Sequence, residues 1–195
     1  MMNITNKLMK RLSLYLFLIL FTLQTPSQAD DIRDFQIEGM SIGDSLLDYF
    51  SESEINSARD ESTKDKIFIQ KTFFAKNSDI YDGIQVSYKN SDSKKIIYNI
   101  AGFIFYPNNI NECKKKMKNI ISEISELFPN AFEKNWGKFK MPDKQGYYFP
   151  VTFDLKDGSR AMVSCQDWRA STDIDDNFKI SLYNSEFSEY LKAQN

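Results

Sequence analysis

The side chains that commonly do chemistry form a restricted set in this chain, because none of its 195 residues is a histidine. Without histidine there is no Ser-His-Asp or Cys-His nucleophilic site, and the commonest transition-metal ligand is missing. A zinc site would need cysteine and carboxylate ligands alone, and Cys113 and Cys165 are too far apart for a C-x-x-C motif. No glycine-rich phosphate loop follows Gly39 and Gly43. We therefore expect no cofactor, and a protein that is not an enzyme is favoured.

Carboxylates are the remaining candidates for catalysis or for binding a hard cation. The densest cluster contains Asp173, Asp175 and Asp176, whose oxygens would suit calcium. The spacing lacks the glycine and the closing glutamate of an EF-hand loop, so a solvated acidic loop is favoured and the metal site is a weak candidate. Glycoside hydrolysis by paired carboxylates stays an alternative, because such pairs meet only in three dimensions.

Two sets of residues, one aromatic and one of lysines, are candidates for binding a partner. An aromatic patch for a sugar or a protein partner would contain Tyr147, Tyr148, Phe149 and Trp168. Strand alternation predicts that about half of these four side chains are buried. A lysine run could attract anionic lipid or an acidic partner, although a solvated helix face is the favoured interpretation: Lys114, Lys115, Lys116 and Lys118.

The N-terminus has the three parts of a secretory signal peptide. Lys7, Lys10 and Arg11 form a positive region, and a mostly apolar run follows at residues 12–23. Ser27-Gln28-Ala29 resembles the small-x-small pattern of signal peptidase sites. A run of about 12 residues is shorter than the ~20 needed to span a membrane, and an uncleaved anchor is the alternative. We predict that residues 1–29 are cleaved near Ala29/Asp30, which leaves a periplasmic or secreted chain with no stable membrane span.

In an oxidising compartment an even cysteine count favours a disulfide. Cys113 lies on the apolar stripe of a predicted helix, and Cys165 has the strand parity of Ala161 and Val163. Both sulfur atoms are therefore expected to face the core. We predict a Cys113–Cys165 disulfide, with two separate buried thiols as the alternative.

The longest amphipathic segment covers residues 109–128 and predicts an α-helix. Asn109 is its expected N-cap, with Glu112 as the capping-box partner, and Pro129 ends it. Its apolar residues recur at steps of three and four and form one stripe: Ile110, Cys113, Met117, Ile120, Ile121, Ile124, Leu127 and Phe128.

Strands are predicted on both sides of this helix, at residues 66–74, 82–89, 95–106, 147–156, 159–166 and 178–183. The alternation in 82–89 predicts that Gln85 and Ser87 point to solvent, and the apolar 95–106 is expected near the centre of the sheet. Short helices are predicted after a Ser41 cap and at 185–191. Between strands, Phe132, Trp136 and Phe139 are expected to fold back onto the core.

This element order predicts an α+β fold, with one antiparallel β-sheet and helices packed on one face. Helix and strands alternate as a tandem of two α-β-β-β halves, residues 35–107 and 108–195, within a single domain at 30–195. A hydrophobic content of 42% supports one substantial core.

The stretch Ile37-Glu38-Gly39-Met40-Ser41 resembles the start of small exported envelope domains of the BamE (SmpA/OmlA) and β-lactamase-inhibitor-protein-like group. The likeness covers about a dozen residues. It implies export and a fold of helices on antiparallel strands, sometimes in tandem. This chain departs from the pattern after the first helix and has no lipid-modified cysteine, so the group's partners do not carry over.

The charge of the chain argues against nucleic acid as a partner. The formal net charge is -2, and it becomes about -5 without the leader, which is not the basic surface that binds phosphate backbones. We expect a secreted or periplasmic, non-enzymatic protein of the cell envelope that binds another envelope protein or a small ligand. A histidine-free hydrolase with paired carboxylates is the alternative.

Overall fold

The computed structural model describes residues 31–62, 65–74, 80–141, 145–172 and 174–194. The predicted signal peptide and its cleavage site lie outside the described residues. In chain order the elements are η1 (Ile32–Asp34), η2 (Leu46–Asp48), α2 (Glu52–Ser57), β1 (Arg59–Asp60), β2 (Phe68–Phe74), β3 (Gly83–Lys89), β4 (Asn99–Phe105), α3 (Ile110–Leu127), β5 (Phe132–Asn135), β6 (Phe139–Lys140), β7 (Gly146–Asp154), β8 (Arg160–Trp168), η4 (Ala170–Thr172), β9 (Asn177–Tyr183) and α4 (Ser185–Ala193).

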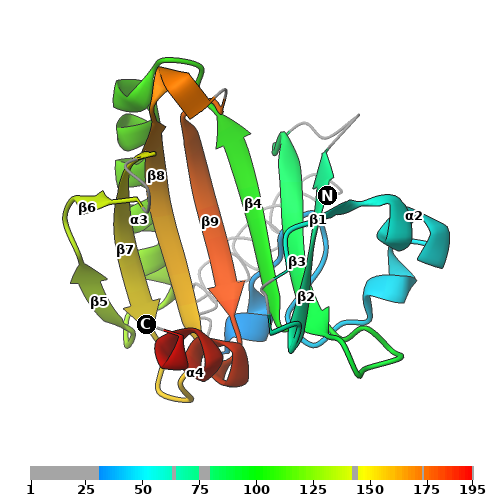
Figure 1. Cartoon of the computed structure of the whole chain (residues 1–195). Helices are drawn as coiled ribbons and strands as arrows, with labels where there is room; N and C mark the ends of the chain where they lie inside the picture. Colours follow the sequence, from blue (N-terminus) through cyan, green and yellow to red (C-terminus); the bar gives the residue numbers. More distant parts are fainter. Residues whose placement is uncertain (1–30, 63–64, 75–79, 142–144, 173, 195) are drawn as a thin grey trace, which may run out of the picture.

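The strands of the described chain form one antiparallel sheet in the order β1-β2-β3-β4-β9-β8-β7-β5, with β6 paired to β7 (Figure 1). The pairing of β4 with β9 runs from Asn99 opposite Tyr183 to Phe105 opposite Asn177. Strands from both predicted halves therefore belong to one sheet. The α+β class and the central position of the strand within 95–106 are confirmed.

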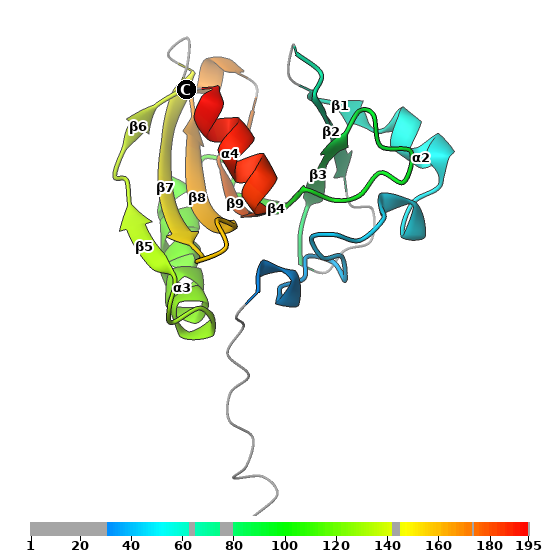
Figure 2. The same ribbon diagram turned by 90° about the horizontal axis from the view of Figure 1, so that it is seen from below.

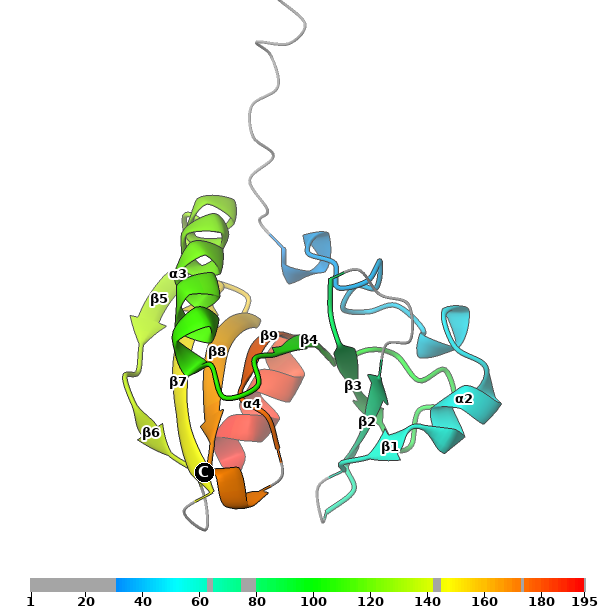
Figure 3. The ribbon, with the colours of Figure 1, turned by 90° about the horizontal axis from the view of Figure 1, so that it is seen from above.

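The outer face of the sheet carries the hydrophobic core. On β9, Phe178, Ile180 and Leu182 point to this face and are buried, while the alternate residues point to the opposite, inner face. α3 covers the outer face over β8 and β9. The N-terminal segment from η1 to α2 contributes fully buried side chains to the same core, including Leu46 and Ile55. Figure 3 shows α3 and this segment on the same side of the sheet.

α4 lies on the inner face, at one end of the sheet (Figure 2). The ring of Phe187 stacks on Tyr183 of β9 at 5.7 Å and meets Phe68 of β2 edge-on at 4.9 Å. In the sheet, β3 and β4 lie between β2 and β9. One helix can contact both β2 and β9 only because the sheet is bent into a trough. The prediction that helices pack on one face is therefore wrong for α4, which covers the inner-face aromatic rings.

α3 begins and ends as the sequence predicts. The Asn109 side chain accepts a hydrogen bond from the Glu112 N–H at 3.3 Å. The helix stripe that faces the sheet contains the buried residues Cys113, Met117 and Ile124. The predicted disulfide is confirmed: Cys113 bonds Cys165 on β8, with the two Cα atoms 6.0 Å apart.

Residues 37–50 do not form the helix predicted after Ser41. Instead, Ile37 and Met40 exchange backbone hydrogen bonds of 3.0 and 3.1 Å around a tight turn, in which Gly39 has a φ of 78°. The Asp44 carboxylate accepts from the Ser41 N–H at 2.8 Å, but only the single turn η2 follows, capped by Ser45.

The ribbon β5–β6 pairs with β7 at the edge of the sheet and does not fold back. Phe132, Trp136 and Phe139 are 66%, 40% and 38% exposed, so the expectation that they return to the core is wrong. These side chains are exposed because they point to the inner face of the sheet. On that face α4 lies over β9 and not over this edge.

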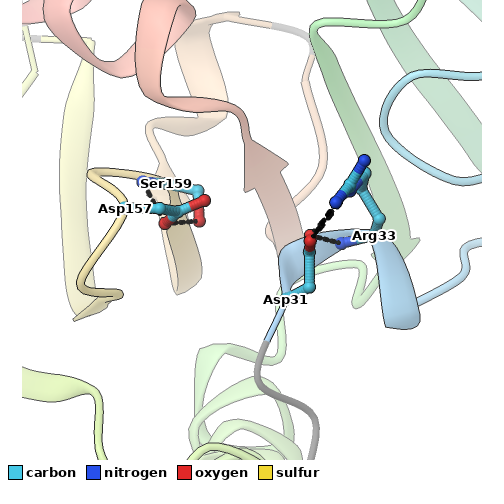
Figure 4. A network of polar contacts seen from close by, with 4 residues as sticks. All are labelled: Asp31, Arg33, Asp157 and Ser159. Atoms are coloured by element: carbon cyan, nitrogen blue, oxygen red, sulfur yellow. Dashed lines mark hydrogen bonds and ion pairs between the residues drawn. The ribbon is translucent and has the colours of Figure 1, made fainter.

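The start of the described chain lies beside the turn between β7 and β8 (Figure 4). The Asp31 carboxylate caps η1 and accepts two hydrogen bonds from the Arg33 Nε, at 2.9 and 3.0 Å. In the turn, Asp157 accepts from the Ser159 N–H at 2.9 Å and from its hydroxyl at 2.6 Å. The hydrogen bond to Asp31 and the charge of Asp31 raise the pKa of Arg33, and the charges of Asp34 and Asp157 add to this shift.

Candidate functional site

The inner face of the sheet is polar at its centre, although it is largely removed from solvent. Ser87, Asn99 and Ser164 are no more than 2% exposed. The Asn99 amide donates to the Leu182 carbonyl oxygen at 2.9 Å, and the Ser87 hydroxyl donates to Asn99 at 3.3 Å. Buried polar groups need such partners, because losing water without a hydrogen bond costs roughly 1–3 kcal/mol. Polar side chains therefore line the centre of the trough, while a second, smaller apolar cluster of Phe68, Tyr183 and Phe187 fills the end under α4.

For Gln85 and Ser87, the alternation of polar and apolar residues gives a wrong prediction of solvent exposure. Their alternation with Ile84 and Val86 predicts a solvent-facing side, yet they are 8% and 0% exposed. The bend of the sheet and neighbouring side chains bury them. The expectation that they point to solvent is wrong.

Beyond the end covered by α4, the inner face holds a groove of about 320 Å³. Its polar side is formed by residues of β1, β2, β3 and β9, together with Glu61, which follows β1: Arg59, Glu61, Thr72, Gln85 and Lys179. Its apolar side is mostly aromatic: Phe74, Phe103, Phe105, Trp168 and Ile174. We call this feature the inner-face groove.

A chain of hydrogen bonds fixes the polar side of the inner-face groove. The Arg59 Nε lies 3.1 Å from a Glu61 carboxylate oxygen, and the Thr72 hydroxyl donates to the other at 2.9 Å. The Gln85 amide nitrogen also donates to Glu61, and to Thr72 at 3.2 Å. The Gln85 oxygen is thereby turned toward Lys179, whose Nζ donates to it at 2.5 Å.

Lys179 is an unusual lysine because its side chain is partly buried in the inner-face groove. Burial lowers the pKa of Lys179 to about 8, and the charge of Glu61 opposes this shift. An ammonium group has three N–H donors, and one of them is used by Gln85. The other two are available to an acceptor in the groove.

Trp168 lines the aromatic side of the groove. Its indole Nε1–H is buried and has no acceptor among the described residues. Its backbone N–H is anchored by the Asp176 carboxylate at 2.9 Å. Phe103 forms the wall with edge-on contacts to Phe74 at 6.0 Å and to Phe105 at 5.3 Å. The groove thus combines an aromatic wall with a lysine ammonium group that keeps two N–H donors beyond its bond to Gln85.

The four residues of the predicted aromatic patch do not share one surface. Tyr147 and Phe149 follow the parity of Val151 on the outer face, beside α3, whereas Tyr148 and Trp168 point to the inner face. All four are partly buried. Only Trp168 belongs to the inner-face groove.

The acidic residues 173–176 are only partly described. Asp173 lies outside the described residues. Asp175 is exposed, and burial raises the pKa of Asp176, whose carboxylate accepts from the Trp168 N–H. No group of three metal-binding side chains is found in the described ranges. In those ranges, too, no helix is long and apolar enough to cross a membrane.

Apart from Trp168, the residues of the groove escape sequence reasoning because they come from strands far apart in the chain. The available signal is a polar residue at alternate positions of otherwise apolar strands, as in Gln85 of β3 and Lys179 of β9. Comparison of the chain with family models, curated proteins and solved structures gives no match.

Proposed function

We propose that this protein is an exported, non-enzymatic binding protein of the cell envelope. Its ligand is a small molecule with an apolar body and one anionic oxygen group, and it binds in the inner-face groove. The observation that carries the proposal is that one groove joins an aromatic wall to the ammonium group of Lys179, which donates to Gln85 and keeps two further N–H donors. A carboxylate or similar oxyanion accepts from the Lys179 ammonium group, and its apolar body packs on Phe103 and Phe105.

Ligand binding is tested with 4-phenylbutyrate and its uncharged analogue 4-phenylbutanol. The Trp136→Phe background leaves Trp168 as the single tryptophan, so its fluorescence reports the groove directly. We expect the carboxylate to bind more tightly than the alcohol. Lys179→Met should weaken carboxylate binding roughly 10- to 100-fold, because a hydrogen bond to a charged group contributes about 1.5–3 kcal/mol.

The matched control is Lys156→Met, which removes an exposed lysine from the turn between β7 and β8. It should leave both affinities unchanged. Equal affinities for acid and alcohol, or equal losses in the two lysine variants, would contradict the proposed ligand class. No Trp168 response to either compound would contradict the groove as the binding site.

Export is supported by the Cys113–Cys165 disulfide, since such bonds persist in oxidising compartments. The test is the intact mass of the protein isolated from its own cells, without reductant. We expect a chain that begins at Asp30 and is two hydrogen atoms lighter than its fully reduced form. A full-length, reduced chain in the cytoplasm would overturn the proposal of export.

The alternative, a histidine-free hydrolase, needs two carboxylates of different pKa in one cleft. Among the described residues lining the inner-face groove, Glu61 is the only acid, and it is paired with Arg59. A larger hollow of about 820 Å³ beside α2 contains Glu38 and Glu54. Hydrogen bonds from Ser51 lower the pKa of Glu54, which makes it a poor general acid. These features favour binding over hydrolysis.

A further inference from the structure

A further hollow, of about 390 Å³, lies on the outer face between α3 and the β5–β6 ribbon. Its rim carries Lys114 and Lys118 from α3 and Lys138 from the link between β5 and β6. Its apolar part is formed by Met117, Ile121 and Phe149. None of the described residues that line it is acidic. Three positive charges from two separate elements therefore surround one apolar surface.

Aromatic rings hold two of these lysines in place. The Lys114 Nζ lies 3.9 Å from the ring centre of Phe149, and the Lys138 Nζ lies 3.6 Å from that of Tyr147. Within the described chain, Lys114, Lys118 and Lys138 form no ion pair. Their positive charges are therefore not neutralised by a protein carboxylate.

Positive charge is concentrated here in a chain that is acidic as a whole. Lys115 and Lys116 are exposed on the adjoining part of α3, and the nearest helix acid, Glu112, lies 4.0 Å from Lys115. The other acids of α3, Glu123 and Glu126, lie in its C-terminal half. We name Lys114, Lys115, Lys116, Lys118 and Lys138 the outer-face lysine cluster. This concentration of positive charge in a chain of negative net charge suits an extended anionic partner.

We propose that the outer-face lysine cluster docks on the surface of a membrane that contains anionic phospholipids. The ammonium groups contact lipid phosphates, and the apolar part of the hollow receives the segment that joins headgroup and acyl chain. Lysines around an apolar floor fit this amphipathic partner better than a purely acidic polypeptide. α3 and α4 lie on opposite faces of the sheet (Figure 2), and the inner-face groove is on the α4 face, so docking leaves the groove accessible to its ligand.

The test is co-sedimentation of the purified, disulfide-bonded protein with vesicles. Vesicles of equal parts phosphatidylcholine and phosphatidylglycerol should bind it, and pure phosphatidylcholine should not. Binding should weaken as salt shortens the screening length. The double variant Lys118→Gln with Lys138→Gln should bind about 25-fold more weakly, or about fivefold for each lysine near the surface.

The matched control is Lys94→Gln with Lys156→Gln, which makes the same change in net charge at two exposed lysines outside the cluster. It should bind like the unchanged protein. Equal weakening by both double variants would overturn the proposal, because binding would then follow net charge alone. Displacement by millimolar inorganic phosphate would assign the cluster to free anions, and equal binding to polyglutamate would assign it to an acidic polypeptide. Either result overturns lipid docking. Unchanged thermal unfolding of the variants verifies that they are folded.

Discussion

Lys179 illustrates how one side chain couples binding to stability. Burial disfavours its ammonium form, and the charge of Glu61 only partly compensates, so its pKa falls to about 8. An unfolded chain exposes this lysine, whose pKa is then near ~10.4. Between these two values the unfolded state binds more protons than the folded state, so the free energy of unfolding rises with pH.

Replacing Lys179 should remove this rise. We expect Lys179→Met to be more stable than the unchanged protein near pH 7, where the buried charge is unfavourable, and the difference should shrink from pH 8 to 10. Urea unfolding at several pH values measures it, with Lys156→Met as the control. Burial also raises the pKa of Tyr183, which lowers stability above pH 10 in all three proteins, so the comparison ends there. A constant difference across the window would contradict the assigned shift.

At the scale of elements, local patterns predict what local interactions determine. The stripe and cap of α3 lie within one segment, and both the helix bounds and its cysteine's inward position agree with prediction. The segment after Ser41 has a similar cap signal, but its Asp44 carboxylate also accepts from the Tyr49 hydroxyl at 2.6 Å, in a compact turn. The exposed position of β5–β6 depends on where α4 lies, which no local pattern encodes.

The disulfide should be the strongest single link between elements. It joins α3 to β8 across a sequence separation of 52 residues. In the chain-entropy model, closing such a loop stabilises the folded state by ~4 kcal/mol. Urea unfolding with and without reductant should show a loss of this order. The variant Cys113→Ala with Cys165→Ala is the control, and it should not respond to reductant. A loss below about 1 kcal/mol would mean that α3 is held almost entirely by packing.

At the scale of the whole molecule, the sheet unites two parts of the chain that the sequence presents as halves. The β4–β9 pairing and the contact of Phe68 with Phe187 both connect them. Neither contact has a signal in the sequence, because each joins residues more than 70 positions apart. The strand content was predictable from alternation, whereas the trough and its groove depend on these distant contacts.

We therefore expect a single cooperative unfolding transition. Both tryptophans, Trp136 and Trp168, lie in the C-terminal half, so their fluorescence follows that part. Hydrogen exchange at the amides of β2 and β3 follows the N-terminal half. The two probes should give the same midpoint in urea. Separate midpoints would show that the halves unfold independently despite their shared sheet.

The two margins of this sheet have a further consequence for the protein at high concentration. The outermost strands are short: β1 has two residues and β5 has four, all of them exposed. Charged side chains of Arg59, Asp60, Glu133 and Lys134 stand along these margins. Short, charged edge strands are a poor template for another molecule to extend the hydrogen-bonded ladder. In a crowded compartment, the folded protein should therefore resist assembly into fibres.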